Sequence, residues 1–261
     1  MRLKLWMACM LSAVMAHAEL RGKTVEYKDG KTTLEGYVVY DDAVQGKRPG
    51  VIVVHDWLGL SDFTRGRADE LAKLGYIALA ADIYGKGVRP KEPKEAMKQV
   101  MQYKGDRTLL RSRVTAAFNE LLKQPQTDAS RVAAMGYCFG GTTALELARS
   151  GAPIVGVVTF HGGLDTPTPQ DAKNIKGKVL VLHGADDPHV PPAQVADFEK
   201  EMNDAKVDWQ LIKYSGAVHA FAVPSAGNDN STGAAYNERA AKRAWQAMKD
   251  FFTEIFSASK A

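Results

Sequence analysis

Three residues that could form a hydrolytic triad follow one another along the chain: Cys138, Asp187 and His219. Cys138 is the centre of Gly136-Tyr137-Cys138-Phe139-Gly140, a glycine-x-nucleophile-x-glycine sequence with Cys where Ser is more usual. The outer glycines suit a turn so sharp that side chains on both sides of the nucleophile would collide. The turn also places the sulfur at a helix N-terminus, which favours the thiolate, and directs the amide of Phe139 to where an oxyanion would form.

The acid and the base follow the nucleophile in the order that this kind of turn requires. Asp187 lies in a loop after the apolar run 179–182, where its neighbour Asp186 competes for the role and either residue could cap the next helix. His219 lies on a loop of small residues after the following predicted strand, within reach of the turn. Three other histidines are interpreted as structural or surface residues: His55, His183 and His189.

Two ordinary explanations compete with thiol chemistry. A lone cysteine is usually a small buried hydrophobe, and a Cys–His pair can also indicate a metal site. The glycine-x-nucleophile-x-glycine turn requires an accessible sulfur, however, and the scattered histidines lack the spacing of metal ligands. We therefore expect covalent catalysis by Cys138 with no metal and no organic cofactor.

The N-terminus has the features of an export signal. Arg2 and Lys4 precede the apolar stretch 5–15, and Ala16-His17-Ala18 fits a cleavage site. We expect cleavage after Ala18 and a periplasmic or secreted protein; the alternative is a cytosolic protein with an apolar first helix. Cys9 would be removed with this segment. The remaining Cys138 would be a free thiol in an oxidising compartment, either buried and inert or kept for its chemistry.

Buried strands alternate with helices from residue 50 onward, which predicts an α/β protein with a mostly parallel sheet covered on both faces. Strands are expected at 51–54, 76–81, 132–137, 154–160, 179–183 and 209–214. Helices are expected at 63–74, 94–103, 107–122, 141–149, 193–202 and 237–255. A hairpin at 24–40 precedes them, and 225–233 reads as a surface loop. Since no linker divides the chain, we expect a signal peptide at 1–18 and one domain at 19–261, without a large cap domain.

Composition excludes several classes of protein. The 261 residues are 45% hydrophobic and 25% charged, which is ordinary for a globular protein and not for a disordered or coiled-coil one. The net charge of +4 is a weak excess without a basic stripe, so nucleic-acid binding has no support. Beyond the N-terminus no stretch approaches the ~20 apolar residues of a membrane helix. We expect a monomer that binds a small molecule.

Taken with the triad order, several short stretches make the sequence similar to the dienelactone hydrolase family of α/β-hydrolases over nearly all of residues 24–256. The matching stretches are His55-Asp56-Trp57-Leu58-Gly59-Leu60, Ala81-Asp82-Ile83-Tyr84-Gly85, the turn 136–141, the G-x-x-D-x-x-V-P pattern of 184–191, and Val218-His219-Ala220-Phe221. The resemblance implies an α/β-hydrolase fold and an ester or lactone hydrolase of the carboxymethylenebutenolidase kind.

The resemblance also assigns roles to residues of this chain. Cys138 would be the nucleophile, Asp187 the acid and His219 the base. The amides of Trp57 and Phe139 would form the oxyanion hole. Asp56 matches a family carboxylate that contacts the resting nucleophile, although it could instead cap a turn. That contact implies a thiol held until substrate binds, which would resist oxidation in an exported protein.

The substrate pocket departs from the best-known pattern of the family. Members that act on dienelactone hold the substrate carboxylate with arginines, and the matching positions here are Lys86 and Val223. One Lys binds a carboxylate more weakly than two arginine guanidinium groups. The sequence therefore still predicts the type of reaction, but it does not identify the substrate. Candidate pocket residues are Tyr84, Lys86, His161 and Phe221, although the aromatic ones could be plain core.

These observations favour an exported hydrolase that cleaves ester or lactone bonds through an acyl-thioester on Cys138. Two alternatives stay open. The same triad could serve an acyltransferase or a peptidase, and a periplasmic binding protein could keep the fold without catalysis.

Overall fold

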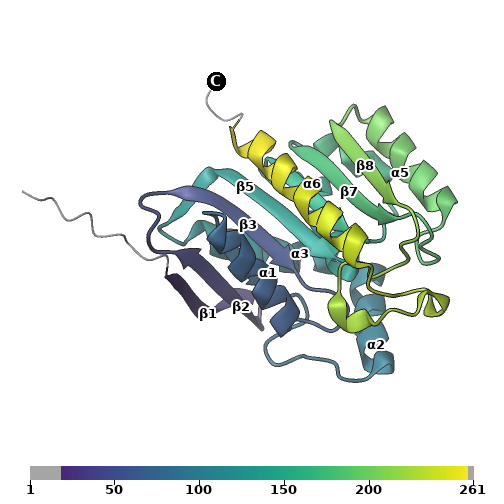
Figure 1. Cartoon of the computed structure of the whole chain (residues 1–261). Coiled ribbons are helices and arrows are strands. Elements are labelled where there is room, and N and C mark those ends of the chain that lie inside the picture. Colours follow the sequence, from purple (N-terminus) through teal and green to yellow (C-terminus); the bar gives the residue numbers. More distant parts are fainter. Residues whose placement is uncertain (1–18, 258–261) are drawn as a thin grey trace, which may run out of the picture.

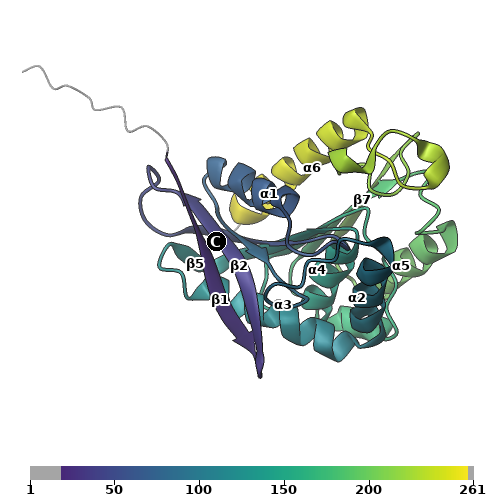
Figure 2. The ribbon, with the colours of Figure 1, turned by 90° about the horizontal axis from the view of Figure 1, so that it is seen from below.

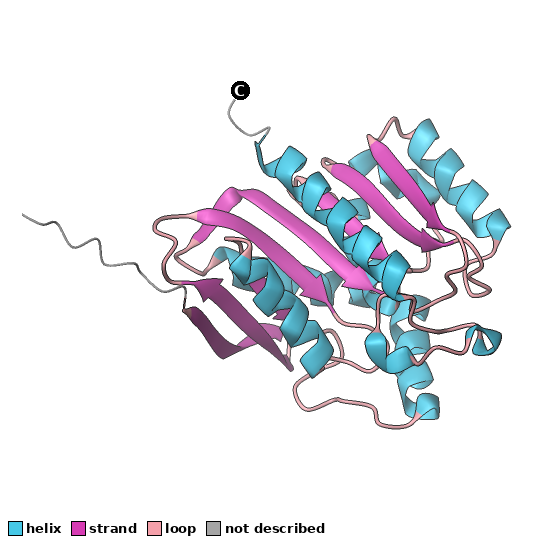
Figure 3. Cartoon of the chain, in the orientation of Figure 1, coloured by secondary structure: helices cyan, strands magenta, loops and turns pink. Residues whose placement is uncertain are grey.

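The computed structural model describes residues 19–257, and the chain in this range forms one eight-stranded sheet flanked by helices (Figures 1 and 3). The export signal predicted for residues 1–18 lies outside the described residues. None of the described helices combines the length and the apolar character needed to span a bilayer.

The strands and helices have the following bounds. The strands are β1 (Leu20–Asp29), β2 (Thr32–Asp41), β3 (Arg48–Val54), β4 (Ile77–Ala81), β5 (Thr127–Tyr137), β6 (Gly156–Phe160), β7 (Lys178–Gly184) and β8 (Trp209–Tyr214). The α-helices are α1 (Asp62–Lys73), α2 (Pro93–Gly105), α3 (Arg107–Leu122), α4 (Phe139–Arg149), α5 (Pro192–Asp204) and α6 (Glu238–Ser257). Three short 3₁₀ helices are η1 (Pro169–Asn174), η2 (Pro224–Ala226) and η3 (Asn230–Thr232), of which η2 and η3 shape the loop predicted at 225–233.

The sheet is parallel except at one edge. Its strand order is β1-β2-β4-β3-β5-β6-β7-β8, and the pairs β1–β2 and β2–β4 are antiparallel while the remaining pairs are parallel. The hairpin of β1 and β2 turns at Gly30, whose φ of +56° suits a residue without a Cβ. The central strands β4 and β6 are buried at every position, as their continuous apolar sequences predicted.

Helices cover both faces of the sheet. Figure 2 shows α1 and α6 on one face and α2, α3, α4 and α5 on the other. The apolar residues fall into two matching clusters, one under α1 and α6 and one under α3, α4 and α5. The α/β class, the mostly parallel sheet and the two helical layers agree with the sequence-based prediction, and no large cap covers the sheet.

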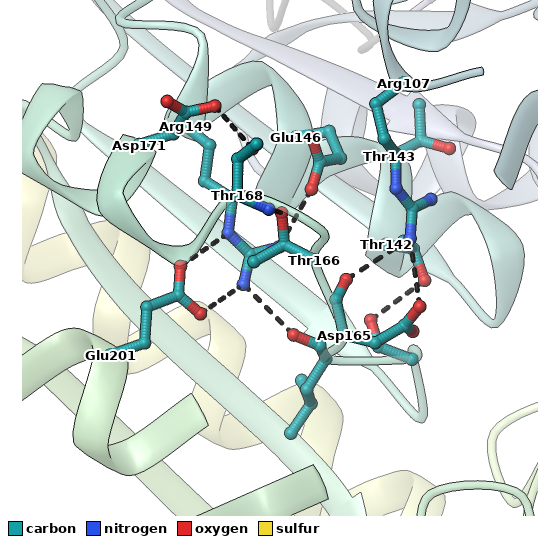
Figure 4. A network of polar contacts seen from close by, with 12 residues as sticks. Arg107, Thr142, Thr143, Glu146, Arg149, Asp165, Thr166, Thr168, Asp171 and Glu201 are labelled. Carbon is teal, nitrogen blue, oxygen red and sulfur yellow. Dashed lines mark hydrogen bonds and ion pairs between the residues drawn. The ribbon is translucent and has the colours of Figure 1, made fainter. Parts of the chain in front are cut away.

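A buried ionic network joins α4, α5 and the loop after β6 (Figure 4). The guanidinium of Arg149 forms two hydrogen bonds to Glu201, at 2.8 and 2.7 Å, and one to Glu146 at 3.1 Å. It also donates to the carbonyl of Leu164 at 3.0 Å. Arg149 is fully buried. This network therefore fixes the loop that leaves the sheet at the carboxyl end of β6.

The carboxyl ends of the parallel strands lie along one edge of the sheet. In an open α/β sheet the loops at this edge form the usual site for substrates. Here they include the loop after β3, the turn between β5 and α4, and the loops after β6, β7 and β8. Residues distant in the chain are thereby brought to one place.

Candidate active site

Cys138 occupies a strained turn between β5 and α4. Its φ is 53°, in the left-handed region that residues with a Cβ rarely adopt, and its N–H donates to the carbonyl of Phe160 at 3.0 Å. A Cβ built on Gly136 would lie 2.1 Å from the carbonyl oxygen of Gly140. One built on Gly140 would lie 2.3 Å from the carbonyl oxygen of Val54. The two glycines therefore allow β5, α4 and β3 to approach closely, as the sequence predicted.

Three residues predicted as a triad meet at this turn. His219 Nε2 lies 3.1 Å from the sulfur of Cys138, and His219 Nδ1 lies 2.8 Å from Oδ2 of Asp187. The side chain of Asp187 is fully buried, while those of Cys138 and His219 are partly exposed. Asp186 is exposed and its backbone N–H donates to the carbonyl of Ala217. Of the two adjacent acids, the structure brings Asp187 to the histidine.

The neighbours of His219 favour its charged form. Burial alone would lower the pKa of this imidazole, but the sulfur of Cys138 and the carboxylate of Asp187 together raise it to about 10. Burial would raise the pKa of Asp187, and the hydrogen bond from His219 outweighs that effect and holds it below its usual value. At neutral pH the arrangement therefore suits a charged imidazole beside the carboxylate of Asp187.

Two backbone amides, those of Phe139 and Trp57, follow the carboxyl ends of β5 and β3. Phe139 is the first residue of α4, where the N–H has no intrahelical acceptor. Trp57 lies in the loop after β3, and its carbonyl accepts a hydrogen bond from the hydroxyl of Tyr84 at 3.1 Å. Among the described residues neither amide donates to a protein acceptor. Both amides can thus donate to a bound group.

Asp56 has a different partner from the one that the family resemblance implied. Its Oδ1 accepts a hydrogen bond from the N–H of Leu58 at 2.8 Å, and the sulfur of Cys138 is paired with His219 instead. Burial raises the pKa of Asp56, and the Leu58 N–H offsets part of that effect. In this structure Asp56 caps the turn after β3, the alternative role considered from the sequence.

The pocket residues predicted from sequence fall into two groups. Tyr84 is buried, with its ring 5.3 Å from that of Phe139 and 4.7 Å from that of His55. Lys86 is exposed and its ammonium pairs with Glu26 on β1, the edge strand. The structure therefore places Tyr84 under the turn. It does not bring Lys86 to the triad, because the side chain of Lys86 extends to Glu26 in the β1–β2 hairpin.

His161 and Phe221 lie behind His219 rather than at an open mouth. The ring of His161 lies 5.3 Å from that of His219 and 5.1 Å from that of Phe221. His161 is 1% exposed, its φ is 41°, and neither ring nitrogen has a hydrogen-bond partner among the described residues. Burial holds the pKa of His161 well below its usual value, so the ring is neutral. Phe221 is fully buried and supports His161 from the core.

His189 contacts His219, which was not predicted from the sequence. It was interpreted as a surface residue, and it is exposed, but its ring lies 5.0 Å from that of His219 at an interplanar angle of 75°. Its backbone N–H donates to Oδ1 of Asp187 at 2.8 Å. The signal available in the sequence was its place two residues after the acid, on the same loop.

His55 has the structural role that the sequence suggested. Its Nε2 accepts the N–H of Ile83 at 3.2 Å, so Nδ1 carries the proton and donates to the carbonyl of Asp56 at 2.6 Å. Burial lowers its pKa to about 4. Both ring nitrogens form hydrogen bonds to backbone groups, and these bonds join the loop after β3 to the loop after β4.

Two surface cavities lie away from the triad. A cavity of about 560 Å³ lies between the β1–β2 hairpin and α3, and it is lined by none of the triad residues. Within residues 19–257 no group of three or more His, Cys, Asp or Glu side chains is arranged to hold a metal ion. The residues at the carboxyl edge of the sheet that can take part in catalysis are therefore those around Cys138.

Comparisons with known proteins agree with this fold. The family model described as "Dienelactone hydrolase family" matches residues 34–256. The structure titled "m3DLH" is 43% identical, with a TM-score of 0.88, and the match covers 91% of this chain and 99% of that one. A dienelactone hydrolase-like promiscuous phosphotriesterase, P91, from metagenomic libraries is 42% identical, with a TM-score of 0.87 and coverage of 92% and 100%.

A curated relative points to the same activity. A protein of Aquifex aeolicus named "Putative carboxymethylenebutenolidase" is 28% identical over 88% of this chain and 97% of its own length. Several other relatives carry the same name, among them proteins of Synechocystis and Yersinia pestis. The family match spans most of the sheet and every loop at its active edge. This chain belongs to the dienelactone hydrolase family of α/β-hydrolases and is a hydrolase of esters or lactones.

Proposed function

We propose that this hydrolase works through a thioester formed on Cys138, with His219 as base and Asp187 as the residue that orients it. The observation that carries the proposal is the pair of contacts made by one imidazole, Nε2 to the sulfur at 3.1 Å and Nδ1 to the buried carboxylate at 2.8 Å. Both contacts have the geometry that a nucleophile–base–acid triad needs.

In the first half of the reaction the thiolate attacks the acyl carbon. The carbonyl electron pair moves to oxygen, and the oxyanion is stabilised by the amides of Trp57 and Phe139. The bond from carbon to the leaving oxygen then breaks, and the imidazolium of His219 gives that oxygen its Nε2 proton. In the second half His219 takes a proton from water, the hydroxide attacks the thioester, and the thiolate is released.

We further propose that the chain is exported and that residues 1–18 are removed on the way. The motif of charge, short apolar stretch and small-x-small triplet supports this proposal. The check is the mature N-terminus, which should be Glu19 in protein recovered from the periplasmic fraction or the culture medium. A chain recovered from the cytosol with Met1 would contradict the proposal.

The decisive test of the thiol mechanism is a screen of aryl esters and small lactones with wild type beside Cys138→Ala. The variant should fold normally and lose hydrolysis, and wild type should form an acyl adduct on Cys138 that mass spectrometry detects. Cys138→Ser should keep some activity because the turn accepts either nucleophile. Retained turnover in a folded Cys138→Ala protein would show that another group attacks the substrate.

The acyl acceptor needs its own measurement, because the same triad can serve an acyltransferase or a peptidase. Our proposal is water as the acceptor. Product analysis in the presence of added alcohols, thiols and amines should give mainly the free acid. Dominant transfer to one added nucleophile, or cleavage of peptides faster than esters, would contradict a hydrolase of esters.

The surroundings of the triad favour substrates without a negative charge. Lys86 pairs with Glu26, and the guanidinium of Arg89 donates to the carbonyls of Gly85 and Val88. Val223, at the second position where some members hold a substrate carboxylate, is an apolar and nearly buried residue. We expect neutral esters to be hydrolysed at least as well as carboxylated lactones of similar size.

Phosphotriester hydrolysis is a second candidate activity. It is supported by the 42% identity to a dienelactone hydrolase-like promiscuous phosphotriesterase over nearly the whole chain. A phosphotriester is neutral, and the two amides beside Cys138 could donate to its phosphoryl oxygen as they would to an acyl oxyanion. An aryl dialkyl phosphate added to the ester screen tests it, and the expected rate is measurable and dependent on Cys138.

A further inference from the structure

We infer that His189 forms the exposed wall of the subsite for the leaving group, and that this subsite favours esters with an aromatic leaving group. The inference rests on the proposed function, because it takes His219 as the acid that protonates the leaving oxygen. It goes further by assigning a role to a residue outside the triad and by naming the substrate class.

The chemistry of acylation decides on which side of the sulfur the leaving group lies. When the bond between the acyl carbon and the leaving oxygen breaks, that oxygen must receive the proton held by Nε2 of His219. This nitrogen lies 3.1 Å from the sulfur of Cys138. The acyl oxygen lies on the opposite side, towards the amides of Trp57 and Phe139. The leaving group must therefore lie against the ring of His219.

Three side chains surround that ring, and they differ in exposure. Asp187 occupies the Nδ1 side and is fully buried at its carboxylate. His161 lies behind the ring and is 1% exposed. His189 is exposed, and its ring meets that of His219 edge to face at 5.0 Å. Of these three neighbours, His189 is therefore the one that a leaving group can touch from the solvent side.

The backbone holds His189 in this place. Its N–H donates to Oδ1 of Asp187, so the carboxylate that orients the base also anchors the loop. The preceding Pro188 packs on Gly233, where an added Cβ would lie 2.9 Å from the proline ring and 3.5 Å from Nε2 of His189. The carbonyl of Gly233 in turn accepts the N–H of His219 at 3.2 Å. The two imidazoles are thus positioned by one set of contacts.

An exposed aromatic face at this position selects for shape. Edge-to-face and offset contacts between aromatic rings add to simple burial of apolar surface, whereas an alkyl chain gains only the burial. Phenols can contact His189 in this way while their oxygen lies at Nε2 of His219. Small alcohols such as ethanol do not extend to His189.

The test compares two esters of the same acid, one with a phenol and one with ethanol as leaving group. Each rate is compared with that of the wild type on the same substrate, so the higher intrinsic reactivity of aryl esters cancels. His189→Ala and His189→Gln should lower kcat/KM for the aryl ester by about two- to tenfold. The ethyl ester should change by less than about twofold, and His189→Phe, which keeps an aromatic face, should keep the aryl preference.

The controls separate this inference from the triad itself. Asp186→Ala changes an exposed residue of the same loop and should leave the aryl-to-ethyl ratio unchanged. An equal loss of kcat/KM on both esters in the His189 variants would show that His189 only positions His219. No loss on either ester would show that His189 does not contact the leaving group. Both results overturn the inference. Activity that survives Cys138→Ala would instead overturn the thiol mechanism.

Discussion

Asp186 and Asp187 are neighbours in the chain but lie in different surroundings. Asp187 is buried and bonded to His219, whereas Asp186 is exposed to solvent. Asp187→Asn should lower kcat by about 10³–10⁴-fold, because an amide no longer stabilises the imidazolium and favours the wrong tautomer. Asp186→Asn should change kcat by less than about threefold, in line with an exposed side chain. Steady-state kinetics on one aryl ester distinguishes them, and a reversed order would show that Asp186 is the triad acid.

His161 has a backbone conformation and an environment that both lower the stability of the folded protein. It combines a left-handed φ with two buried ring nitrogens that lack partners among the described residues. His161→Phe keeps a ring of similar shape and removes both unpaired polar atoms, so it should stabilise the protein by about 1 kcal/mol. For a domain of this size that corresponds to a Tm about 2–4 °C higher.

Thermal unfolding of wild type and His161→Phe checks this, with circular dichroism to confirm the native fold. His161→Asn, which keeps a polar group and loses the ring, is the matched control and should lower Tm. A lower Tm in the Phe variant would mean that the imidazole nitrogens are hydrogen-bonded in solution.

Residue types and order were enough to predict the triad, but not the direction of individual side chains. Cys138, Asp187 and His219 were predictable because each follows a strand of the parallel part of the sheet, and such strand ends share one edge. Lys86 also follows a strand, yet it pairs with Glu26 across the hairpin. The contact between His189 and His219 depends on two loop conformations, which the local sequence does not encode.

At the scale of elements, the predicted helices and strands agree closely with the observed ones where a buried apolar run or a clear helical period exists. The strand predicted at 132–137 begins earlier, at Thr127, because its polar first residues pair with the start of β3. The helix predicted from residue 141 begins at Phe139, directly after the nucleophile. Both differences arise from tertiary contacts, which outweigh the local pattern at the ends of elements.

The network around Arg149 is the main polar connection between elements near the site. Arg149→Met leaves the buried carboxylate of Glu201 without its partner and frees the carbonyl of Leu164. Removing one member of a buried ion pair typically destabilises a protein by about 3–5 kcal/mol. Urea denaturation should therefore show a midpoint well below that of the wild type.

The double variant Arg149→Met/Glu201→Leu provides the control for this prediction. It replaces both members of the pair with apolar side chains and should recover much of the lost stability, because no unpaired charge remains in the core. A double variant no more stable than Arg149→Met would show that the pair itself contributes little and that the contact with Leu164 is what matters.

At the scale of the whole molecule, the sheet gathers residues that the chain keeps far apart. Cys138 and His219 are 81 positions apart in sequence, and their reactive atoms are 3.1 Å apart in space. The strained turn at Cys138 opposes folding and persists because the surrounding core outweighs it. The contacts of His219 with Cys138 and Asp187 act in the opposite direction and favour the folded state when these groups are charged. The stability of the molecule should therefore respond to the ionisation of its own active site.

The pH dependence of unfolding gives a direct measure of that link. In the folded protein the pKa of His219 rises from the ordinary 6.5 to about 10. A raised pKa means that the folded state binds the proton more tightly than the unfolded state. The contribution of His219 to the free energy of unfolding is therefore complete below about pH 6.5, and it is lost as the pH rises through about 10.

The sulfur of Cys138 is the foremost group that raises this pKa, against the opposing effect of burial. Wild type should thus lose more stability between pH 7 and pH 10 than Cys138→Ala, as measured by urea denaturation at several pH values. Lysines, and tyrosines other than Tyr84, titrate alike in both proteins. The difference therefore reports mainly on the pair, and parallel curves would show that no imidazolium–thiolate pair stabilises the folded state.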